Sequence, residues 1–504
     1  MILCAEWGIS RCTMDRATVV AALLAAAACA ALAGGPSFDP TNMTRVGTVD
    51  ARFQSYNIEM VEVTGGRFWK PYDSEPPTAG TDLYAYRPPI DLNNIKLRKL
   101  AAALAPAYLR VSGTWANSTY FSDIEPVPST APAGFNGILT PGQWRDVVDF
   151  SRAADAKIVT SFAISPGVRD AAGVWMPDQA ARLLAYTRLL GGSIAAAEFM
   201  NEPDLPAING APAGYDAAAY GRDFKIFRSF IKQAAPGIMV LGPGAAGEAA
   251  LAADLLAAAG PGVDVFSYHH YGTLSERCVG TSAPEAALSE QWLAQTDRAL
   301  TFHRTLRNQF EPGKPIWLTE TADAACGGNR WSSTFLDTFR YLDQLGRLAK
   351  VGVQVVMHNT LAASDYGLLD ETTLTPRPNY WGALLWRRLM GTTVLESGVP
   401  LEQGLHVYAH CQRGKSGGVA LLVINTDRIA SRALRLTSAS ERYALDATSL
   451  RSAIVQLNGT TLALDDNGDL PPTEGRSTPA GSLTFAPATI SFLTIPGAGN
   501  RACQ

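Results

Sequence analysis

The sequence has little that suits a nucleic acid or an anionic membrane as a partner. Its 504 residues include 42 Lys and Arg against 46 Asp and Glu, which gives a formal net charge of −4. It also lacks a basic cluster, and the nearest approach is Lys96, Arg98 and Lys99. Because binding to polyanions depends on concentrated positive charge, neither kind of partner is expected.

The sequence also lacks an apolar run of the ~20 residues that a membrane-spanning helix needs near its N-terminus. The run from Ala17 to Leu32 is shorter and consists mostly of alanine. It follows the charged Met14–Arg16 and ends in the small-x-small pattern of residues 31–33, which is typical of an export signal. We therefore expect residues 1–33 to be an export signal and the mature protein to be secreted or periplasmic, without a membrane span. An N-terminal membrane anchor is the alternative.

Cysteines are few, and no CxxC or HExxH motif accompanies them, so no metal site is expected. Three of the seven lie in the expected signal, and Cys278, Cys326, Cys411 and Cys503 remain. An even number of cysteines in an exported chain indicates disulfides. The sequence alone permits three pairings.

Along the chain, short apolar runs alternate with segments whose apolar residues recur at helical spacing, such as Phe335, Phe339, Leu342 and Leu345. The expected strands are Ala51–Ile58, Ala107–Val111, Ile158–Ile164, Ala197–Met200, Ile238–Gly242, Val263–Tyr268, Pro315–Thr319 and Val353–Met357. Alternating units with buried, nearly continuously apolar strands predict an α/β fold, a (β/α)8 TIM barrel over residues 50–395.

After the barrel, the pattern changes to short runs of alternating polarity broken by Gly, Asn, Asp and Pro. These runs are Leu405–Ala409, Val419–Ile424, Ala433–Leu436, Ser482–Phe485 and Ile490–Ile495. They predict a C-terminal antiparallel β-sandwich domain over residues 396–504, to which residues 34–49 add a strand near Thr44–Val49.

Two of the expected barrel strands lead into a carboxylate. The fourth is followed by Asn201-Glu202-Pro203 and the seventh by Glu320. Strand ends in a TIM barrel form a single catalytic rim, which by the same count also receives Glu59, Arg110, His269-His270-Tyr271 and His358. Retaining glycoside hydrolysis needs two facing carboxylates, one to attack the anomeric carbon and one to protonate the leaving oxygen. Glu202 and Glu320 are therefore the candidate catalytic pair.

The sequence resembles glycoside hydrolase family 79, the heparanase and β-glucuronidase family of the large retaining barrel clan A, from about Phe53 to the C-terminus. The blocks that carry the resemblance are residues 106–110 (PAYLR), 200–203 (MNEP), 269–271 (HHY), 317–321 (WLTET) with Gly327-Gly328, 352–357 (GVQVVM), 379–381 (NYW) and 455–459 (VQLNG).

The resemblance implies a role for each matching residue. Glu202 would be the acid/base and Glu320 the nucleophile, with Asn201 on the sugar 2-hydroxyl and Tyr271 holding the nucleophile. The uronate carboxylate would bind the backbone of Gly327 and the hydroxyl of Tyr366. Neutral donors suit that task, because a nearby cation would also weaken Glu320 as a nucleophile. Further sugar contacts are expected from Thr114, Glu59 and His270.

The same resemblance implies that Cys411 pairs with Cys503. Cys278 and Cys326 follow strands six and seven, which are neighbours in a barrel, so we predict this second pair as well. No room exists between strands one and two for an excised linker, so an active single chain is expected.

The predicted function is retaining hydrolysis of β-D-glucuronide bonds, heparanase-like, as an endo-β-glucuronidase on heparan-sulfate-type chains. One alternative is an exo-β-glucuronidase on non-sulfated or small glucuronides, which the lack of basic clusters favours. An alternative of another class is a glycan-binding protein whose active site has lapsed. We expect a monomer without cofactors, whose partner is a glucuronic-acid-containing oligosaccharide or polysaccharide.

Three short patterns suggest other chemistry. Residues 242–247, with Asp264 about twenty residues on, resemble a dinucleotide fingerprint, but this acid opens its strand. Residues 414–418 match a serine-hydrolase elbow, but they lie between two expected β strands. His269-His270 could bind a metal, but no third ligand stands at suitable spacing. None of the three is expected to define the function.

Overall fold

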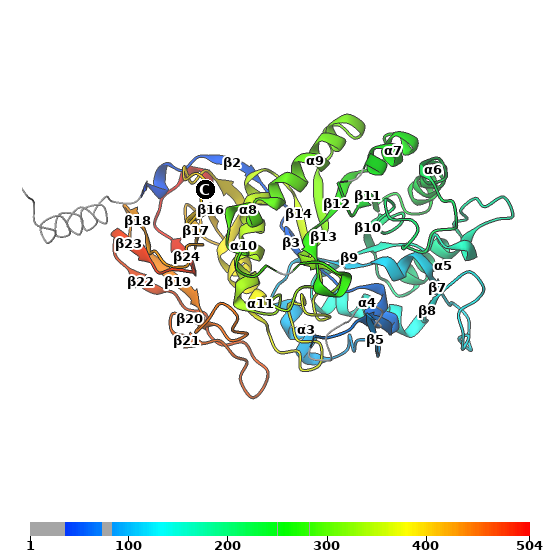
Figure 1. The fold of residues 1–504 in the computed structure, drawn as a ribbon, viewed down its shortest axis with the longest axis horizontal. Coiled ribbons are helices and arrows are strands. Elements are labelled where there is room, and N and C mark those ends of the chain that lie inside the picture. Colours follow the sequence, from blue (N-terminus) through cyan, green and yellow to red (C-terminus); the bar gives the residue numbers. More distant parts are fainter. Residues whose placement is uncertain (1–35, 73–82, 249, 282) are drawn as a thin grey trace, which may run out of the picture.

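The computed structural model describes residues 36–72, 83–248, 250–281 and 283–504. Within these residues the predicted barrel is present: eight parallel strands close on themselves in chain order (Figure 1). They are β3 (Gln54–Asn57), β6 (Ala107–Val111), β9 (Ala156–Ser161), β10 (Ile194–Glu198), β11 (Met239–Ala245), β12 (Val265–Leu274), β13 (Ile316–Ala325) and β14 (Val355–His358). Each corresponds to an expected strand, and β12 and β13 extend well past their expected ends. The expected export signal lies outside the described residues.

Helices follow the barrel strands and cover the outside of the barrel. They are α3 (Ile95–Ala102), α4 (Pro141–Ala153), α5 (Asp178–Leu189), α6 (Ala217–Ala234), α7 (Ala250–Ala259), α9 (Gln295–Phe310), α10 (Phe335–Lys350) and α11 (Pro378–Leu389). Local sequence fixes where they begin: in α4, Thr140 and Gln143 form a capping box around Pro141. Short helices α2 (Met60–Thr64) and α8 (Glu290–Leu293) lie in the connections.

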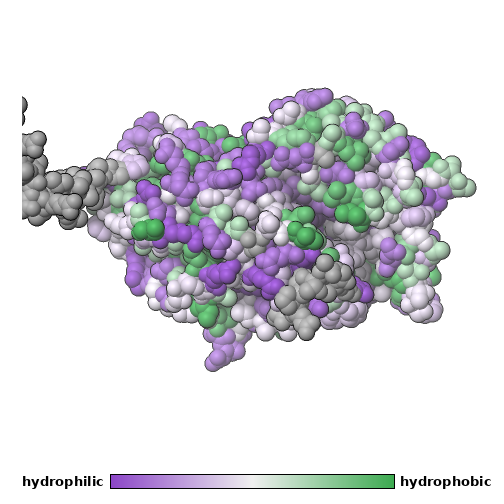
Figure 2. Space-filling model, viewed as in Figure 1, coloured by the Kyte–Doolittle hydropathy of each residue, from purple (hydrophilic) through white to green (hydrophobic). Residues whose placement is uncertain are grey.

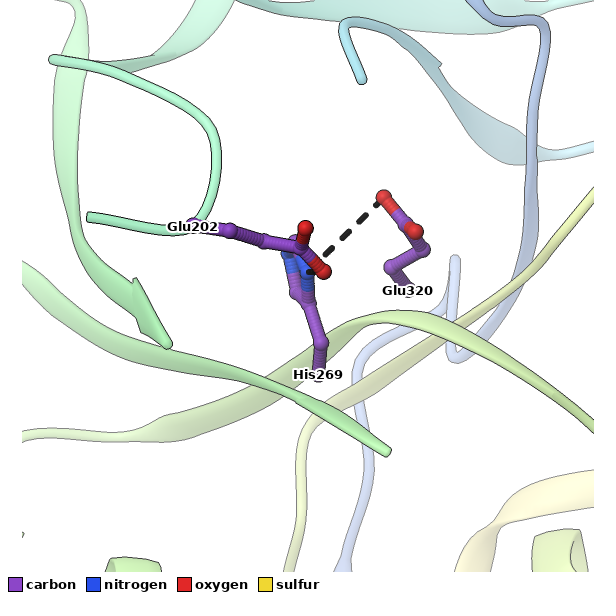
Figure 3. A group of neighbouring side chains, drawn as sticks. All are labelled: Glu202, His269 and Glu320. Carbon is purple, nitrogen blue, oxygen red and sulfur yellow. Dashed lines mark hydrogen bonds and ion pairs between the residues drawn. The ribbon is translucent and has the colours of Figure 1, made fainter. Parts of the chain in front are cut away.

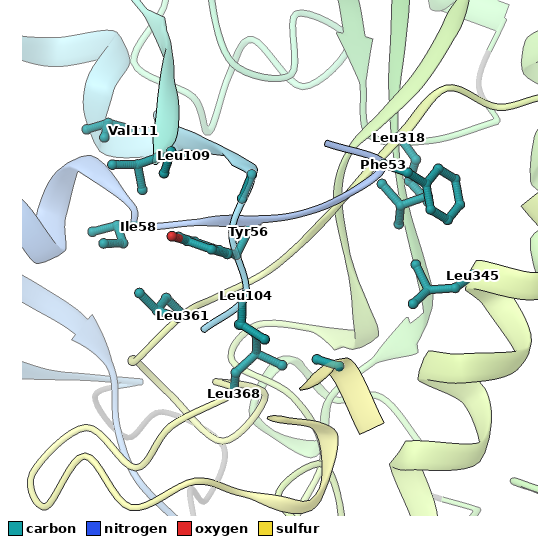
Figure 4. Close-up of a cluster of buried hydrophobic side chains, with 14 of the residues drawn as sticks. Phe53, Tyr56, Ile58, Leu104, Leu109, Val111, Leu318, Leu345, Leu361 and Leu368 are labelled. Atoms are coloured by element: carbon teal, nitrogen blue, oxygen red, sulfur yellow. The ribbon is translucent and has the colours of Figure 1, made fainter. Parts of the chain in front are cut away.

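Hydrophobic side chains fill the barrel interior and the layer beneath the helices. Figure 4 shows part of the main core, where Phe53 and Tyr56 come from the start of the barrel and Leu345 from α10. A separate apolar layer inside the barrel includes Tyr108, Ala196 and Val265. Side chains two positions further along a strand point the same way. The inward positions above this layer are therefore residues such as Arg110, Glu198 and Ser267, and the lining becomes polar toward the C-terminal rim.

The C-terminal part forms two sheets that pack face to face, as predicted. The larger has β2 (Arg45–Thr48), β15 (Met390–Leu395), β16 (His406–Gln412), β17 (Val419–Asn425), β24 (Thr489–Ile495), β19 (Ser440–Asp446), β20 (Gln456–Leu457), β21 (Thr460–Thr461) and β22 (Arg476–Thr478). The smaller has β1 (Ser37–Phe38), β18 (Arg432–Leu436) and β23 (Gly481–Phe485). Side chains of both sheets, such as Phe38 and Leu421, share one buried cluster.

Five strands of the larger sheet were not expected, namely β15, β19 and the short strands β20, β21 and β22. Strand β19 lies in a polar stretch, and β15 falls within the residues assigned to the barrel but pairs with β2 and β16. Two small two-stranded sheets complete the fold: β4 (Gly66–Trp69) pairs antiparallel with β5 (Tyr84–Arg87), and β7 (Thr119–Phe121) pairs parallel with β8 (Gly137–Leu139).

Both predicted disulfides are present. Cys411 in β16 pairs with Cys503 near the C-terminus, and Cys278 pairs with Cys326 across the loops after β12 and β13. Disulfides form and persist in oxidising compartments. No helix among the described residues is long and apolar enough to cross a membrane. On the face shown in Figure 2, hydrophilic side chains predominate over the β domain, and hydrophobic ones are interspersed over the barrel.

A buried charge cluster joins the barrel to the β domain. Asp343 of α10 accepts hydrogen bonds from His406 Nδ1 at 2.5 Å and from the Tyr408 hydroxyl at 2.6 Å, both from β16. Arg347 of α10 bonds to Asp343 at 2.6 Å and to Glu290 at 2.8 Å. Burial opposes the charging of His406, but Asp343 and Glu290 outweigh it and raise its pKa to about 9.

This cluster predicts that stability falls at alkaline pH. The pKa of His406 rises on folding from 6.5 to about 9, so its contribution is complete below pH 6.5 and is lost as pH rises toward 9. The loss expected in the free energy of unfolding is about 3 kcal/mol, measured by urea unfolding at several pH values. His406→Gln should remove this slope. His410→Gln should keep it, because the buried His410 on the same strand has a pKa lowered to about 4. Equal slopes in the wild type and His406→Gln would contradict this assignment.

Candidate active site

Glu202 and Glu320 meet at the C-terminal rim of the barrel. Glu202 follows β10, and Glu320 lies in β13, separated from the apolar Ile316–Leu318 by Thr319. Figure 3 shows both side chains pointing toward His269 of β12. One carboxylate oxygen of each acid and one ring nitrogen of His269 all lie within 4.8 Å of one another. Glu202 has a φ of 48°, a left-handed conformation that is uncommon outside glycine and is often found at functional sites.

A bulge in β13 turns Glu320 into the barrel. Tyr268 pairs with Leu318, but the next residue, His269, pairs with Glu320, so Thr319 is an extra residue in β13. Without this residue, strand alternation would place Glu320 on the face opposite to His269. The bulge is therefore what brings the two side chains to the same side.

Glu320 is held as an oriented anion. The Tyr271 hydroxyl donates to Oε1 at 2.6 Å, and Arg110 Nη1 donates to Oε2 at 2.8 Å. Burial opposes ionisation, but His269, Arg110 and the Tyr271 hydrogen bond outweigh it and lower the pKa of Glu320. A carboxylate that is charged at neutral pH and held in a fixed direction has the properties that a nucleophile requires.

Glu202 has the opposite electrostatic environment. Its pKa is raised by burial and by the charge of Glu320, while the hydrogen bond to His269 partly offsets this. This direction agrees with the expectation for an acid that is protonated at rest. Two neighbouring carboxylates with opposite pKa shifts are the pattern of a nucleophile and an acid/base.

His269 lies between the acids, and Arg110 sets its protonation pattern. Arg110 Nη2 lies 3.3 Å from His269 Nε2, and because a guanidinium can only donate, Nε2 accepts. In the neutral ring the proton is then on Nδ1, which lies 3.1 Å from Glu202 Oε1 and donates to it. Burial opposes charging of the ring, but Glu320 and the hydrogen bond to Glu202 outweigh it and raise the pKa of His269, and Nδ1 donates to Glu202 in the charged ring as well. Glu202, His269 and Glu320 offer ligand atoms at a spacing that a metal cation could use, but the positive charge of the neighbouring Arg110 guanidinium opposes cation binding.

Arg110 connects the two halves of the site. Besides Glu320, it donates to Glu198 Oε2 at 2.9 Å and to Asn201 Oδ1 at 2.8 Å, and it is 1% exposed. Asn117 fixes the backbone of Asn201 by accepting from its N–H at 2.8 Å. The Asn201 Nδ2 group has no hydrogen-bond partner among the described residues, so it is free to donate to a ligand.

On the opposite side of Glu320, Asn359 gathers three of the predicted substrate contacts. Its Nδ2 group donates to Glu59 Oε1 at 2.9 Å, to the Tyr271 hydroxyl at 3.0 Å and to the Tyr366 hydroxyl at 3.2 Å. Burial and the charge of Glu320 raise the pKa of Glu59 well above its usual range. A glucuronate-sized ligand next to Glu320 would therefore meet a Glu59 carboxyl that holds its proton more strongly than an exposed glutamate does.

The predicted carboxylate-binding elements are also neighbours. The Asp365 N–H donates to the Gly327 carbonyl at 3.1 Å, which places the glycine turn beside Tyr366. Gly327 and Gly328 have φ values of 82° and 85°, which glycine adopts without strain. A Cβ on Gly327 would lie 2.7 Å from Trp69 Cβ, so the turn has no room for a side chain. Thr114 lies on the β6 side of the rim, where its hydroxyl donates to Asn209 at 2.7 Å.

The structure does not bring His270 to the acids. Residues of β12 alternate, so His269 and Tyr271 face the barrel while His270 faces α9. It lines a pocket with Gln295, Arg298 and His303 of that helix. His269 was expected on the rim, with ring hydrogen bonds at the strand end, but not as a partner of the acids, and no role was predicted for Asn359, Asn117, Asn209 or Glu198. Alternation counted back from Tyr271 is the signal that could have identified His269.

A family model described as "Glycosyl hydrolase family 79, N-terminal domain" matches residues 88–346, more than half of the chain. The chain belongs to glycoside hydrolase family 79. Residues 88–346 of this family 79 chain include both Glu202 and Glu320.

Curated relatives match over most or part of the family 79 chain. Heparanase-like protein 1 of Arabidopsis thaliana is 27% identical over 475 residues, which cover 82% of this chain and 86% of that protein. Baicalin-beta-D-glucuronidase of Scutellaria baicalensis is 36% identical over 192 residues, 36% of each chain. A solved 4-O-alpha-L-rhamnosyl-beta-D-glucuronidase from Fusarium oxysporum superposes with a TM-score of 0.63 at 15% identity, over 92% of this chain and 99% of that one. This last likeness supports the fold alone.

Proposed function

We propose that this family 79 protein is an exported, retaining β-glucuronide hydrolase. The observation that carries the proposal is the pair of carboxylates, Glu320 buried and Glu202 partly buried, which have opposite pKa shifts and whose oxygens lie within 4.8 Å of each other. Retaining glycosidases hold their two carboxyl groups about 5–5.5 Å apart, whereas inverting enzymes need a wider gap for a water molecule. The short separation supports a double displacement.

In the first step, Glu320 attacks the anomeric carbon while Glu202 gives its proton to the leaving oxygen, so the glycosidic bond breaks and a glycosyl ester forms on Glu320. The ester neutralises Glu320, and the pKa of Glu202 falls because the nearby negative charge is gone. Glu202 then takes a proton from the incoming water, which hydrolyses the ester and restores both carboxyl groups. His269 orients Glu202 in both steps.

Neutral donors around the glycine turn support a uronate as the sugar. The Gly327 backbone and the Tyr366 hydroxyl would bind the carboxylate, Asn201 the 2-hydroxyl, and Glu59 and Thr114 the hydroxyls at the far edge of the ring. Arg277 donates to the Cys326 carbonyl at 3.2 Å and to the Gly328 carbonyl at 2.9 Å. It thereby fixes the turn without presenting its charge to the ligand.

Replacing Glu202 with alanine is expected to affect substrates unequally. Hydrolysis of a glucuronide with a poor leaving group should slow by about 10³-fold, because protonation of the leaving oxygen is lost. The glycosylation step with a dinitrophenyl leaving group, which needs no protonation, should slow by less than about tenfold. Steady-state and burst kinetics on both substrates measure this, and the alkaline limb of the pH profile should disappear in the variant. Equal slowing of both substrates would contradict the acid/base role.

The intact acid pair argues against a lapsed glycan-binding protein, and turnover of any aryl β-glucuronide would exclude one. Product sizing separates the remaining candidates. Large fragments from heparan sulfate indicate endo action, and release of free glucuronate from non-sulfated or small glucuronides indicates exo action.

A further inference from the structure

The backbone of the glycine turn, residues 326–329, has its carbonyl groups occupied and its glycine N–H groups free. The carbonyls of Cys326, Gly327 and Gly328 accept hydrogen bonds, in that order, from the Ser275 hydroxyl at 3.0 Å, the Asp365 N–H at 3.1 Å and the Tyr72 hydroxyl at 3.0 Å. Gly327 and Gly328 are buried, and their N–H groups have no acceptor among the described residues. Because a buried N–H group without a partner costs stability, this arrangement suits an anionic ligand such as the proposed uronate carboxylate.

Asp323 fixes the far end of this turn. Its Oδ2 atom accepts a hydrogen bond from the Asn329 N–H at 3.1 Å, and its Oδ1 atom accepts one from the Ser332 hydroxyl at 2.7 Å. Ser332 lies directly against the turn, since a Cβ on Gly328 would lie 2.6 Å from its Oγ atom. Asp323 therefore connects the end of the glycine turn to strand β13.

Asp323 and Glu320 lie on opposite faces of β13. They are three positions apart, so strand alternation turns Glu320 into the barrel and Asp323 to the outside, toward α10. One strand thus carries the proposed nucleophile on its inner face and the support of the glycine turn on its outer face. A role for Asp323 in substrate binding is therefore indirect and acts through the turn.

Asp323 is a buried acid that forms no ion pair within the described part of the chain. Arg340 of α10 attracts its charge, but this guanidinium donates to both oxygens of Asp337, at 2.6 Å and 2.8 Å. Burial and the charge of Asp337 raise the pKa of Asp323 to about 7, while Arg340 and the two hydrogen bonds offset this only in part. An acid kept in such an environment lowers stability, and acids of this kind are concentrated at functional sites.

We propose that Asp323 is a positioning residue that sets the preference for a uronate, because it holds the glycine turn with the free N–H groups directed at the sugar carboxylate. The inference rests on the proposed glucuronidase function and explains how that site distinguishes a uronate from a neutral sugar. Without Asp323, Asn329 and Ser332 lose their acceptor, and the direction of the glycine N–H groups is no longer fixed. Glu202 and Glu320 keep their contacts, so only the part of binding that depends on the carboxylate weakens.

The test compares 4-nitrophenyl β-D-glucuronide with the matching β-D-glucoside, which differs from it only at C6, at about pH 5.5. At this pH the Asp323 carboxyl is mostly neutral, so its removal changes hydrogen bonds rather than charge. The wild type should prefer the glucuronide. Asp323→Ala should lower kcat/KM for the glucuronide at least about tenfold, mainly through a higher KM, and leave kcat/KM for the glucoside within about threefold.

Two matched variants separate positioning from general disruption. In Asp323→Asn the amide oxygen can accept from the Asn329 N–H and the NH2 group can donate to the Ser332 hydroxyl, so the preference should stay within about threefold of the wild type. Asp337→Asn changes the acid whose charge acts on Asp323, but Asp337 bonds to Arg340 and Asn379 rather than to the turn. This variant should keep the preference even if it unfolds at a lower temperature.

A glucuronide preference that survives in folded Asp323→Ala, or that falls equally in Asp323→Asn or Asp337→Asn, would overturn the proposal. If Asp323→Ala does not fold, Ser332→Ala takes its place. It removes one of the two hydrogen bonds and should lower the same preference at least about threefold, so an unchanged preference would again contradict the inference. A wild type that hydrolyses the glucuronide no better than the glucoside contradicts the proposed function instead, which distinguishes the two failures.

Discussion

Replacing Glu320 with alanine is expected to lower kcat on an aryl β-glucuronide by roughly 10⁴-fold or more, because no covalent intermediate can form without the nucleophile. The fold should survive, since Tyr271 and Arg110 keep other hydrogen-bond partners, Asn359 and Glu198. The measurement is kcat together with thermal unfolding of the same preparation.

Added azide sharpens this prediction. A small anion can occupy the space left by the missing carboxylate and attack the anomeric carbon directly, which displaces the aryl group and gives the α-glucuronyl azide. Glu320→Gln is the matched variant: it keeps the volume of the side chain, so it should be equally inactive but resist azide rescue. Activity near the wild-type value in Glu320→Ala would contradict the assignment of the nucleophile.

Replacing Arg110 with alanine is expected to have the largest effect on stability, a loss of about 3 kcal/mol or more in the free energy of unfolding. The guanidinium is buried against Glu198 and Glu320, and removing it leaves both carboxylates without their cation. The pKa of Glu320 should rise as well, which moves the acidic limb of the activity profile to higher pH. Urea unfolding and the pH dependence of kcat/KM measure the two effects.

Two further variants test whether the loss of stability comes from leaving buried charges unpaired or from a general loss of packing. Arg182→Ala removes a largely exposed ion pair with Asp123 and should cost about 1 kcal/mol or less. Adding Glu198→Gln to Arg110→Ala should recover part of the lost stability, because one uncompensated buried charge is removed. If Arg110→Ala destabilises no more than Arg182→Ala, Arg110 is not the cation that supports these acids.

The fold could be predicted because the barrel strands are short, apolar and regularly spaced. The two acids could be found because each follows such a strand, where burial makes a carboxylate conspicuous. The roles of Asn201, Tyr271, Gly327 and Tyr366 came instead from family resemblance, and they remain predictions.

What could not be predicted depends on contacts between distant segments. The bulge at Thr319 has no signature in the sequence, and the choice between His269 and His270 requires knowing which strand face is inside. Asn359 follows an apolar strand, but its place in the site depends on its hydrogen bond to Glu59, which lies 300 positions earlier in the chain. Arg110 was expected on the rim, but the preference for neutral donors near Glu320 did not anticipate that its guanidinium pairs with both Glu320 and Glu198.

The central claim is that Glu202 and Glu320 hydrolyse a β-glucuronide by double displacement. It is tested most directly by following the anomeric protons by NMR during hydrolysis of an aryl β-glucuronide, before the product mutarotates. Our account predicts that β-glucuronic acid appears first and the α anomer only later. Initial release of the α anomer, or no hydrolysis of the β-glucuronide by a folded protein, would contradict it.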